Sequence, residues 1–96
     1  LLTNQRIRND IALTGEIDLN GNVHRIGGLR KKLYGAKDSG VVLVMCPYGN
    51  MEDLNRIKKD NTDLITDKFE VILVKTIWDV LKHIFYESKK LKYNIF

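Results

Sequence analysis

Two short apolar runs, Val41–Cys46 and Phe69–Val74, constrain the fold more than any other feature of the sequence. Both are rich in β-branched residues, which is typical of strands that are buried on both faces. Between them, the pattern predicts a helix from Met51 to about Lys58, with Asn50 as its N-cap, followed by a polar loop. Because a helix connects the two strands, we expect them to pair in parallel within a sheet that helices cover.

An alternating segment lies near the beginning of the chain. Apolar and polar residues alternate from Ile11 to Leu19, which is the period of a half-buried strand. Asn20-Gly21 supplies the two residues with positive φ that a type I′ turn requires, and Val23–Ile26 follows as the partner strand. The sequence therefore predicts a β-hairpin over residues 11–26.

A helix is predicted over Leu29–Asp38, after the Gly27-Gly28 corner and before a Ser39-Gly40 stop. At about 100° per residue, its three inward apolar side chains fall within roughly 60° of one another. On the same wheel Lys31 points to water, whereas Lys32 lies only about 70° from the centre of the apolar face. The inward residues are Leu29, Leu33 and Ala36.

Lys32 and Thr14 are the residues that could take part in chemistry. A lysine at the edge of an apolar face usually extends its amine into solvent. A lysine that is partly removed from water instead favours the neutral amine, which can act as a general base. Thr14 is either an ordinary strand residue or the source of a hydroxyl that bonds to such an amine. Geometry alone leaves both alternatives open for both residues.

The last predicted helix runs from Ile77 to about Lys90, with Thr76 as its cap. Its apolar residues recur at helical spacing. They are Ile77, Val80, Leu81, Ile84 and Phe85. A basic, aromatic tail follows over residues 91–96 and is expected to fray. The predicted order is hairpin, helix, strand, helix, strand, helix, which is an α/β (α+β) fold.

Composition excludes several classes of protein. Ninety-six residues make one domain or part of one, and the single cysteine, Cys46, allows neither an internal disulfide nor a cysteine-based zinc site. His24 and His83 do not have the spacing of metal ligands. Every apolar run is far shorter than the ~20 residues of a membrane span. The net charge of +4 permits weak binding to nucleic acid without arguing for it. Since the chain begins with Leu1, we expect it to be a fragment.

Several of these segments resemble the C-terminal half of the Lon protease proteolytic domain. The resemblance rests first on Thr-Gly-Glu-Ile at residues 14–17 and on Ile-Gly-Gly-Leu-Arg-Lys-Lys at residues 26–32. It continues through Val-Leu-Val-Met-Cys-Pro, Asn-Met-Glu-Asp-Leu and Thr-Ile-Trp-Asp-Val-Leu, at residues 42–47, 50–54 and 76–81. It covers nearly the whole chain, apart from the last few residues.

The resemblance implies a ribosomal-protein-S5-domain-2-like fold and an ATP-dependent serine protease that degrades misfolded or regulatory proteins. It implies that Lys32 is the lysine of a Ser-Lys dyad and that Thr14 matches the threonine beside it. The serine would lie upstream, and Ser39 and Ser88 stand in the wrong motifs to replace it. We therefore expect the chain alone to be inactive, with no cofactor or metal site of its own.

For the complete enzyme, the resemblance implies a homo-hexamer that uses ATP and Mg and resides in the cytoplasm or the mitochondrial matrix, without membrane attachment. The alternative is a non-catalytic remnant that serves as a partner- or nucleic-acid-binding α/β module. The sequence immediately before Leu1 would discriminate between the two, and steep salt dependence of DNA binding would favour the second.

Overall fold

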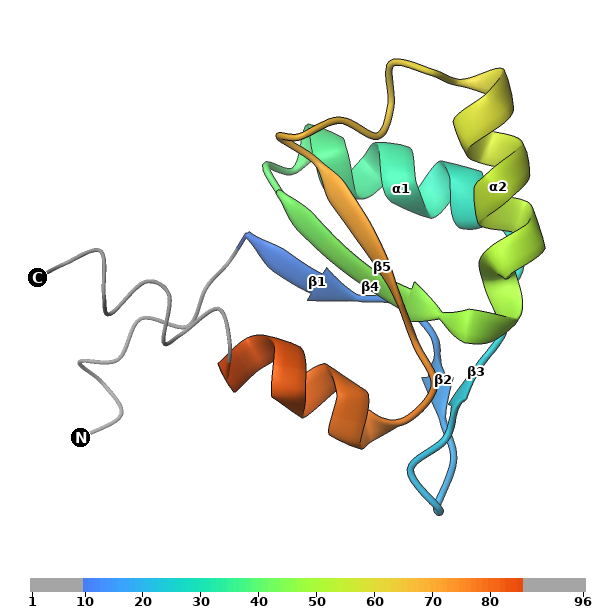
Figure 1. Ribbon diagram of the computed structural model, residues 1–96, viewed down its shortest axis with the longest axis vertical. Helices are drawn as coiled ribbons and strands as arrows, with labels where there is room; N and C mark the ends of the chain where they lie inside the picture. The colour runs from blue at the N-terminus through green and yellow to red at the C-terminus, as the bar shows by residue number, and fades with distance from the viewer. Residues whose placement is uncertain (1–9, 86–96) are drawn as a thin grey trace, which may run out of the picture.

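The computed structural model describes residues 10–85, which form two sheets and three helices (Figure 1). The larger sheet has three parallel strands in the order β1-β4-β5, and the smaller one pairs β2 with β3 in antiparallel fashion. This architecture confirms the predicted α+β class. The strands are β1 (Ile11–Leu13), β2 (Glu16–Ile17), β3 (Val23–His24), β4 (Leu43–Pro47) and β5 (Glu70–Val74). The helices are α1 (Leu29–Asp38), α2 (Met51–Asp60) and a last helix over residues 77–85.

β4 is the central strand, and all five of its residues are buried. Its parallel pairing with β5 confirms the prediction, but β5 is an edge strand in which only Val74 is fully buried. Side chains of β4 alternate between the two faces of the sheet. Val44 and Cys46 pack in the core beneath α1 and α2, whereas Met45 packs with Val80 of the last helix. The sheet therefore lies between two helical layers (Figure 1).

The predicted strand from Ile11 to Leu19 is wrong in one respect, because the chain breaks at Thr14 and Gly15. Residues before the break pair in parallel with β4, and residues after it pair with β3. The Thr14 N–H donates to the Met45 carbonyl at 2.9 Å, and Gly15 then adopts a φ of 140°. Pairing with the buried central strand thus ends β1 early, and the glycine redirects the chain into the small sheet.

The hairpin turn also differs from the predicted type I′ turn. Gly21 has a φ of 86°, but Asn20 has no positive φ. The Gly21 N–H donates to the Asp18 carbonyl at 3.0 Å, which makes a three-residue loop with glycine in the left-handed position. The Asp18 carboxylate accepts from the backbone N–H groups of Asn20 and Asn22, at 2.8 and 3.0 Å. The hydrogen bond with the His24 side chain has the largest effect on the Asp18 carboxylate, and the bonds from these amides add to it. Together they hold the pKa of Asp18 well below its usual range.

Helix α1 has the predicted bounds and the predicted inward face. Leu29 and Leu33 are buried, and Ala36 packs against the same core. At the carboxyl end, Gly40 has a φ of 90°, and the N–H groups of Gly40 and Val41 return to the carbonyls of Lys37 and Ala36. These paired bonds form a Schellman motif, so the predicted glycine stop is confirmed.

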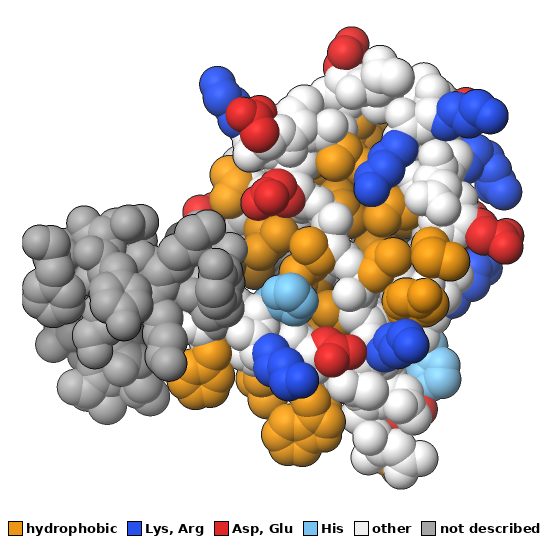
Figure 2. Space-filling view, viewed as in Figure 1, with side chains coloured by type: hydrophobic (Ala, Val, Ile, Leu, Met, Phe, Trp, Pro, Cys, Tyr) orange, Lys and Arg blue, Asp and Glu red, His pale blue; other side chains and the backbone are white. Residues whose placement is uncertain are grey.

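The last helix begins with the predicted cap. The Thr76 hydroxyl accepts from the Asp79 N–H at 3.4 Å, and the Asp79 carboxylate accepts from the N–H groups of Lys75 and Thr76. These backbone donors lower the pKa of Asp79. Val80 is buried against the sheet, but three of the apolar residues at helical spacing are exposed: Leu81, Ile84 and Phe85. Figure 2 shows hydrophobic side chains gathered over this helix. Residues 86–96 lie outside the described part, as do residues 1–9.

The reactivity of the Cys46 thiol tests whether solvent reaches the core around β4. Burial raises the pKa of Cys46 to about 11, from an ordinary value of 9.0. We expect the thiol of the folded protein to react very slowly with Ellman's reagent at pH 8, and to react at once in urea. Since folding favours the protonated thiol, its contribution to stability is complete below pH 9 and is lost as the pH rises toward 11.

Unfolding of a Cys46→Ala variant provides the control, because the variant should lack this part of the pH dependence. Rapid reaction of the native thiol without denaturant would contradict the structure.

Candidate catalytic site

A cavity of about 480 Å³ opens where the larger sheet, the hairpin and α1 meet. It brings together Thr14, from the break between β1 and β2, and Lys32, from the first turn of α1. The two residues that the sequence singled out therefore share one cavity. Its lining residues are Leu13, Thr14, Gly15, Glu16, Arg25, Ile26, Gly27 and Lys32.

Thr14 is held by its backbone. Its N–H bond to the Met45 carbonyl fixes the residue against the central strand, and its side chain is half-buried. Gly15, which follows it, fits closely between two neighbours. A Cβ atom there would lie 2.8 Å from Cγ1 of Val23 and 2.9 Å from Cγ of Pro47. The position of Thr14 therefore depends on both the sheet and the glycine that follows.

Lys32 is positioned by the start of α1. Its N–H donates to the Gly28 carbonyl at 3.1 Å, and Gly28 has a left-handed φ of 68°. Lys31 and Lys32 are both exposed, but only Lys32 lines the cavity. The predicted outward direction of Lys31 is confirmed. Among the described residues Lys32 is exposed, as a lysine at the edge of an apolar face usually is, and the alternative of partial removal from water is not found there.

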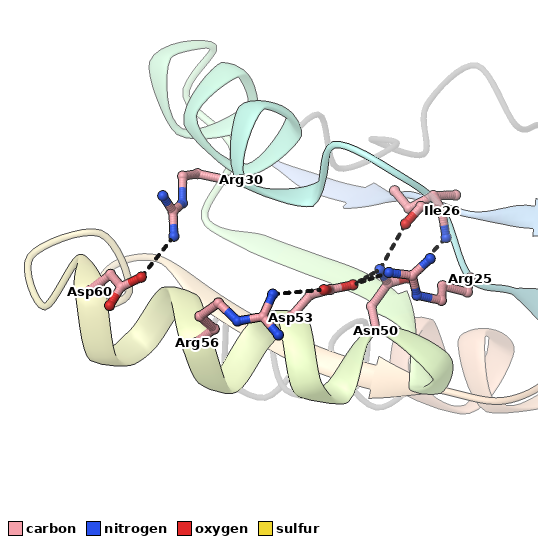
Figure 3. Close-up of polar contacts among 7 residues, drawn as sticks. All are labelled: Arg25, Ile26, Arg30, Asn50, Asp53, Arg56 and Asp60. Carbon is pink, nitrogen blue, oxygen red and sulfur yellow. Dashed lines mark hydrogen bonds and ion pairs between the residues drawn. The ribbon is translucent and has the colours of Figure 1, made fainter.

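Two further charged residues, Glu16 and Arg25, also line the cavity. Glu16 lies at the start of β2, and Arg25 follows β3. Arg25 donates to Oδ2 of Asp53, on α2, at 3.1 Å (Figure 3). Glu16 belongs to the Thr-Gly-Glu-Ile segment. No local pattern marks Arg25, because its contact with Asp53 exists only once β4 has brought α2 alongside.

The sequence-based prediction for Asn50 is wrong. This residue was predicted as the N-cap of α2, but its side chain makes no capping bond and is completely buried. Its Oδ1 accepts from the Ile26 N–H at 3.0 Å, and its Nδ2 donates to the Ile26 carbonyl at 2.9 Å. Nδ2 also donates to Oδ2 of Asp53 at 2.8 Å (Figure 3). Its position just before α2 favoured a cap, and no local pattern in the sequence indicates the contact with Ile26.

A second cavity, of about 460 Å³, lies along the segment of residues 25–30 and reaches α2. Three arginines line it together with two aspartates, and each arginine pairs with one of them. Arg30 pairs with Asp60 at 3.2 Å, and Arg56 lies 3.6 Å from Asp53. The charges therefore tie α1 and the corner to α2. Within residues 10–85, no group of three or more His, Cys, Asp or Glu side chains gathers that could hold a metal ion.

Comparison with known proteins identifies the family to which this segment belongs. The family described as "Lon protease (S16) C-terminal proteolytic domain" matches residues 1–87. The chain belongs to this family. It is 42% identical over 82 residues to the Lon protease of Lachnoclostridium phytofermentans, and 40% identical over 98 residues to that of Rickettsia typhi. These alignments cover 85% and 99% of the chain.

The chain spans only 10% and 12% of the length of these two relatives. The chain is also 43% identical over 83 residues to the Lon protease of Azospirillum brasilense, and it covers 10% of the length of that protein. In the part of the chain that the structure describes, none of the helices combines the length and hydrophobicity of a membrane span.

Two glycine substitutions test the break beside Thr14. Gly15→Ala should destabilise the protein by about 1–3 kcal/mol, because it forces a Cβ into a close contact at positive φ. The matched control is Gly35→Ala in α1, where a Cβ meets nothing within 4 Å. It should stabilise the helix by about 0.5–1 kcal/mol. Urea unfolding measures both changes. Equal effects of the two substitutions would show that the break does not depend on glycine.

Proposed function

We propose that this chain supplies the general base of a Ser-Lys protease, with Lys32 as the dyad lysine and Thr14 as its neighbour. The observation that carries the proposal is that one cavity holds both residues. Support comes also from the family, whose relatives named above are all Lon proteases. The Lys32 side chain lines this cavity and is exposed to solvent.

In this mechanism, a serine from outside the present sequence attacks the scissile carbonyl. The Lys32 amine takes the proton of the serine hydroxyl and then passes it to the leaving amine, while Thr14 orients the lysine. General acid–base catalysis of this kind contributes roughly 10²–10⁴-fold to the rate. An amine acts as a base only when it is unprotonated, and removal from water favours that state. Because Lys32 is exposed here, the rest of the protein would have to cover it.

For the complete protein we propose ATP-dependent degradation of misfolded or regulatory proteins in the cytoplasm. The proposal includes a homo-hexamer, with ATP and Mg bound by other parts of the polypeptide. It is supported by the names and the bacterial sources of the relatives, all of which are much longer than this chain.

Substitution of the two adjacent lysines in the complete protein tests the assignment. Lys32→Ala should lower the rate of ATP-dependent casein cleavage by at least about 10²-fold, because the general base is lost. Lys31→Ala, on the exposed side of the same helical turn, should stay within about twofold of the parent rate. The 96-residue chain alone should cleave no casein. Full activity of the Lys32→Ala variant would refute the dyad assignment.

A further inference from the structure

The corner that carries the Lys32 site has little to hold it in place by itself. Gly27 and Gly28 are the most flexible kind of residue, and added Cβ atoms at either position would meet nothing within 4 Å. No side chain caps the N-terminus of α1 at Gly28. Yet Ile26 and Gly27 form one wall of the cavity, and the Gly28 carbonyl accepts from the Lys32 N–H. The geometry of the site therefore requires an anchor outside the corner.

Asn50 supplies that anchor. Its amide bonds both to the N–H and to the carbonyl of Ile26, the residue directly before the two glycines. Two bonds from one planar amide fix the position and the orientation of the Ile26 backbone together. The side chain is completely buried, so leaving these groups unpaired would cost stability. Because the Asn50 amide makes three hydrogen bonds, its side chain is held in one position in the structure.

Asp53 accepts a further hydrogen bond from the Asn50 amide, whose orientation the two bonds to Ile26 already set. A carboxylate only accepts hydrogen bonds, so its Oδ2 must face Nδ2 of Asn50, which lies 2.8 Å away. Arg25, which lines the cavity, donates to the same carboxylate oxygen, and Arg56 lies beside the other one. The Asn50 oxygen faces the Ile26 N–H, and the charged groups around Asp53 add stability to this arrangement (Figure 3).

We propose that Asn50 is a positioning residue for Lys32: by holding Ile26, it sets where the glycine corner starts α1 and thus where Lys32 stands relative to Thr14. This inference rests on the proposed function. Without the amide, the corner can relax, and the lysine shifts with the first turn of its helix. A misplacement of about 1 Å in a catalytic group can cost on the order of 10²-fold in rate.

The test uses the complete protein, with a fluorogenic peptide as substrate and with thermal unfolding measured alongside. Asn50→Ala should lower kcat by roughly 10- to 100-fold while KM changes little, because the substrate-binding surfaces remain. Asn50→Ser keeps a hydroxyl that can bond to one of the two Ile26 groups and places no second carboxylate beside Asp53. It should lower kcat less, and it takes over the test if the alanine variant does not fold. Asn55→Ala, which changes an exposed asparagine of α2, is the control and should match the parent.

Asp53→Asn separates positioning from a merely structural role. It removes the ion pairs with Arg25 and Arg56 but leaves both bonds between Asn50 and Ile26 possible. It should lower the unfolding temperature while kcat falls no more than about threefold. The proposal is overturned if a folded Asn50 variant keeps the parent kcat, or if Asp53→Asn lowers kcat as much as Asn50→Ala does.

Lys32→Ala, measured in parallel, distinguishes failure of this inference from failure of the proposed function. Full activity of that variant would refute the dyad, and with it the positioning role. An inactive Lys32→Ala variant together with a fully active, folded Asn50→Ala variant would refute the positioning role alone.

Discussion

The burial of one central strand is the constraint on which the rest of the structure depends. β4 packs on both faces, and its carboxyl end provides both supports of the cavity. The Met45 carbonyl holds Thr14 on one side. Three residues beyond the strand, Asn50 holds Ile26 on the other side. Two segments that belong to different elements are thereby brought to one place because each is bonded to the same short stretch of chain.

Local signals in the sequence were sufficient for the parts of the fold that depend on neighbouring residues. The bounds of α1, its Gly40 stop and the Thr76 cap were all predictable, because glycine conformation and capping act within one helical turn. The parallel pairing of β4 and β5 followed from the order of the elements. The break at Thr14 was not predictable from alternation, because it arises from pairing with a strand far along the chain.

In the candidate site too, the features that depend on neighbouring residues were predictable and those that depend on distant contacts were not. Periodicity placed Lys32 at the edge of an apolar face, and the resemblance to Lon proteases attached a role to it and to Thr14. Neither could show that the two residues share a cavity, since that depends on how β1, the hairpin and α1 meet. Asn50 was misread for a related reason: its position favours a cap, and only the tertiary structure offers its amide a better partner in Ile26.

The parallel register also has a consequence for the order in which the chain folds. Ile11 pairs with Leu43, and Leu43 pairs with Glu70, so each pairing must close a loop of about 30 residues before it gains any stability. The hairpin of β2 and β3 and the helices need only local contacts, which form in microseconds or less. We therefore expect assembly of the sheet to be the slow step of folding. Until it is complete, β4 is an exposed apolar strand, and the cavity does not yet exist.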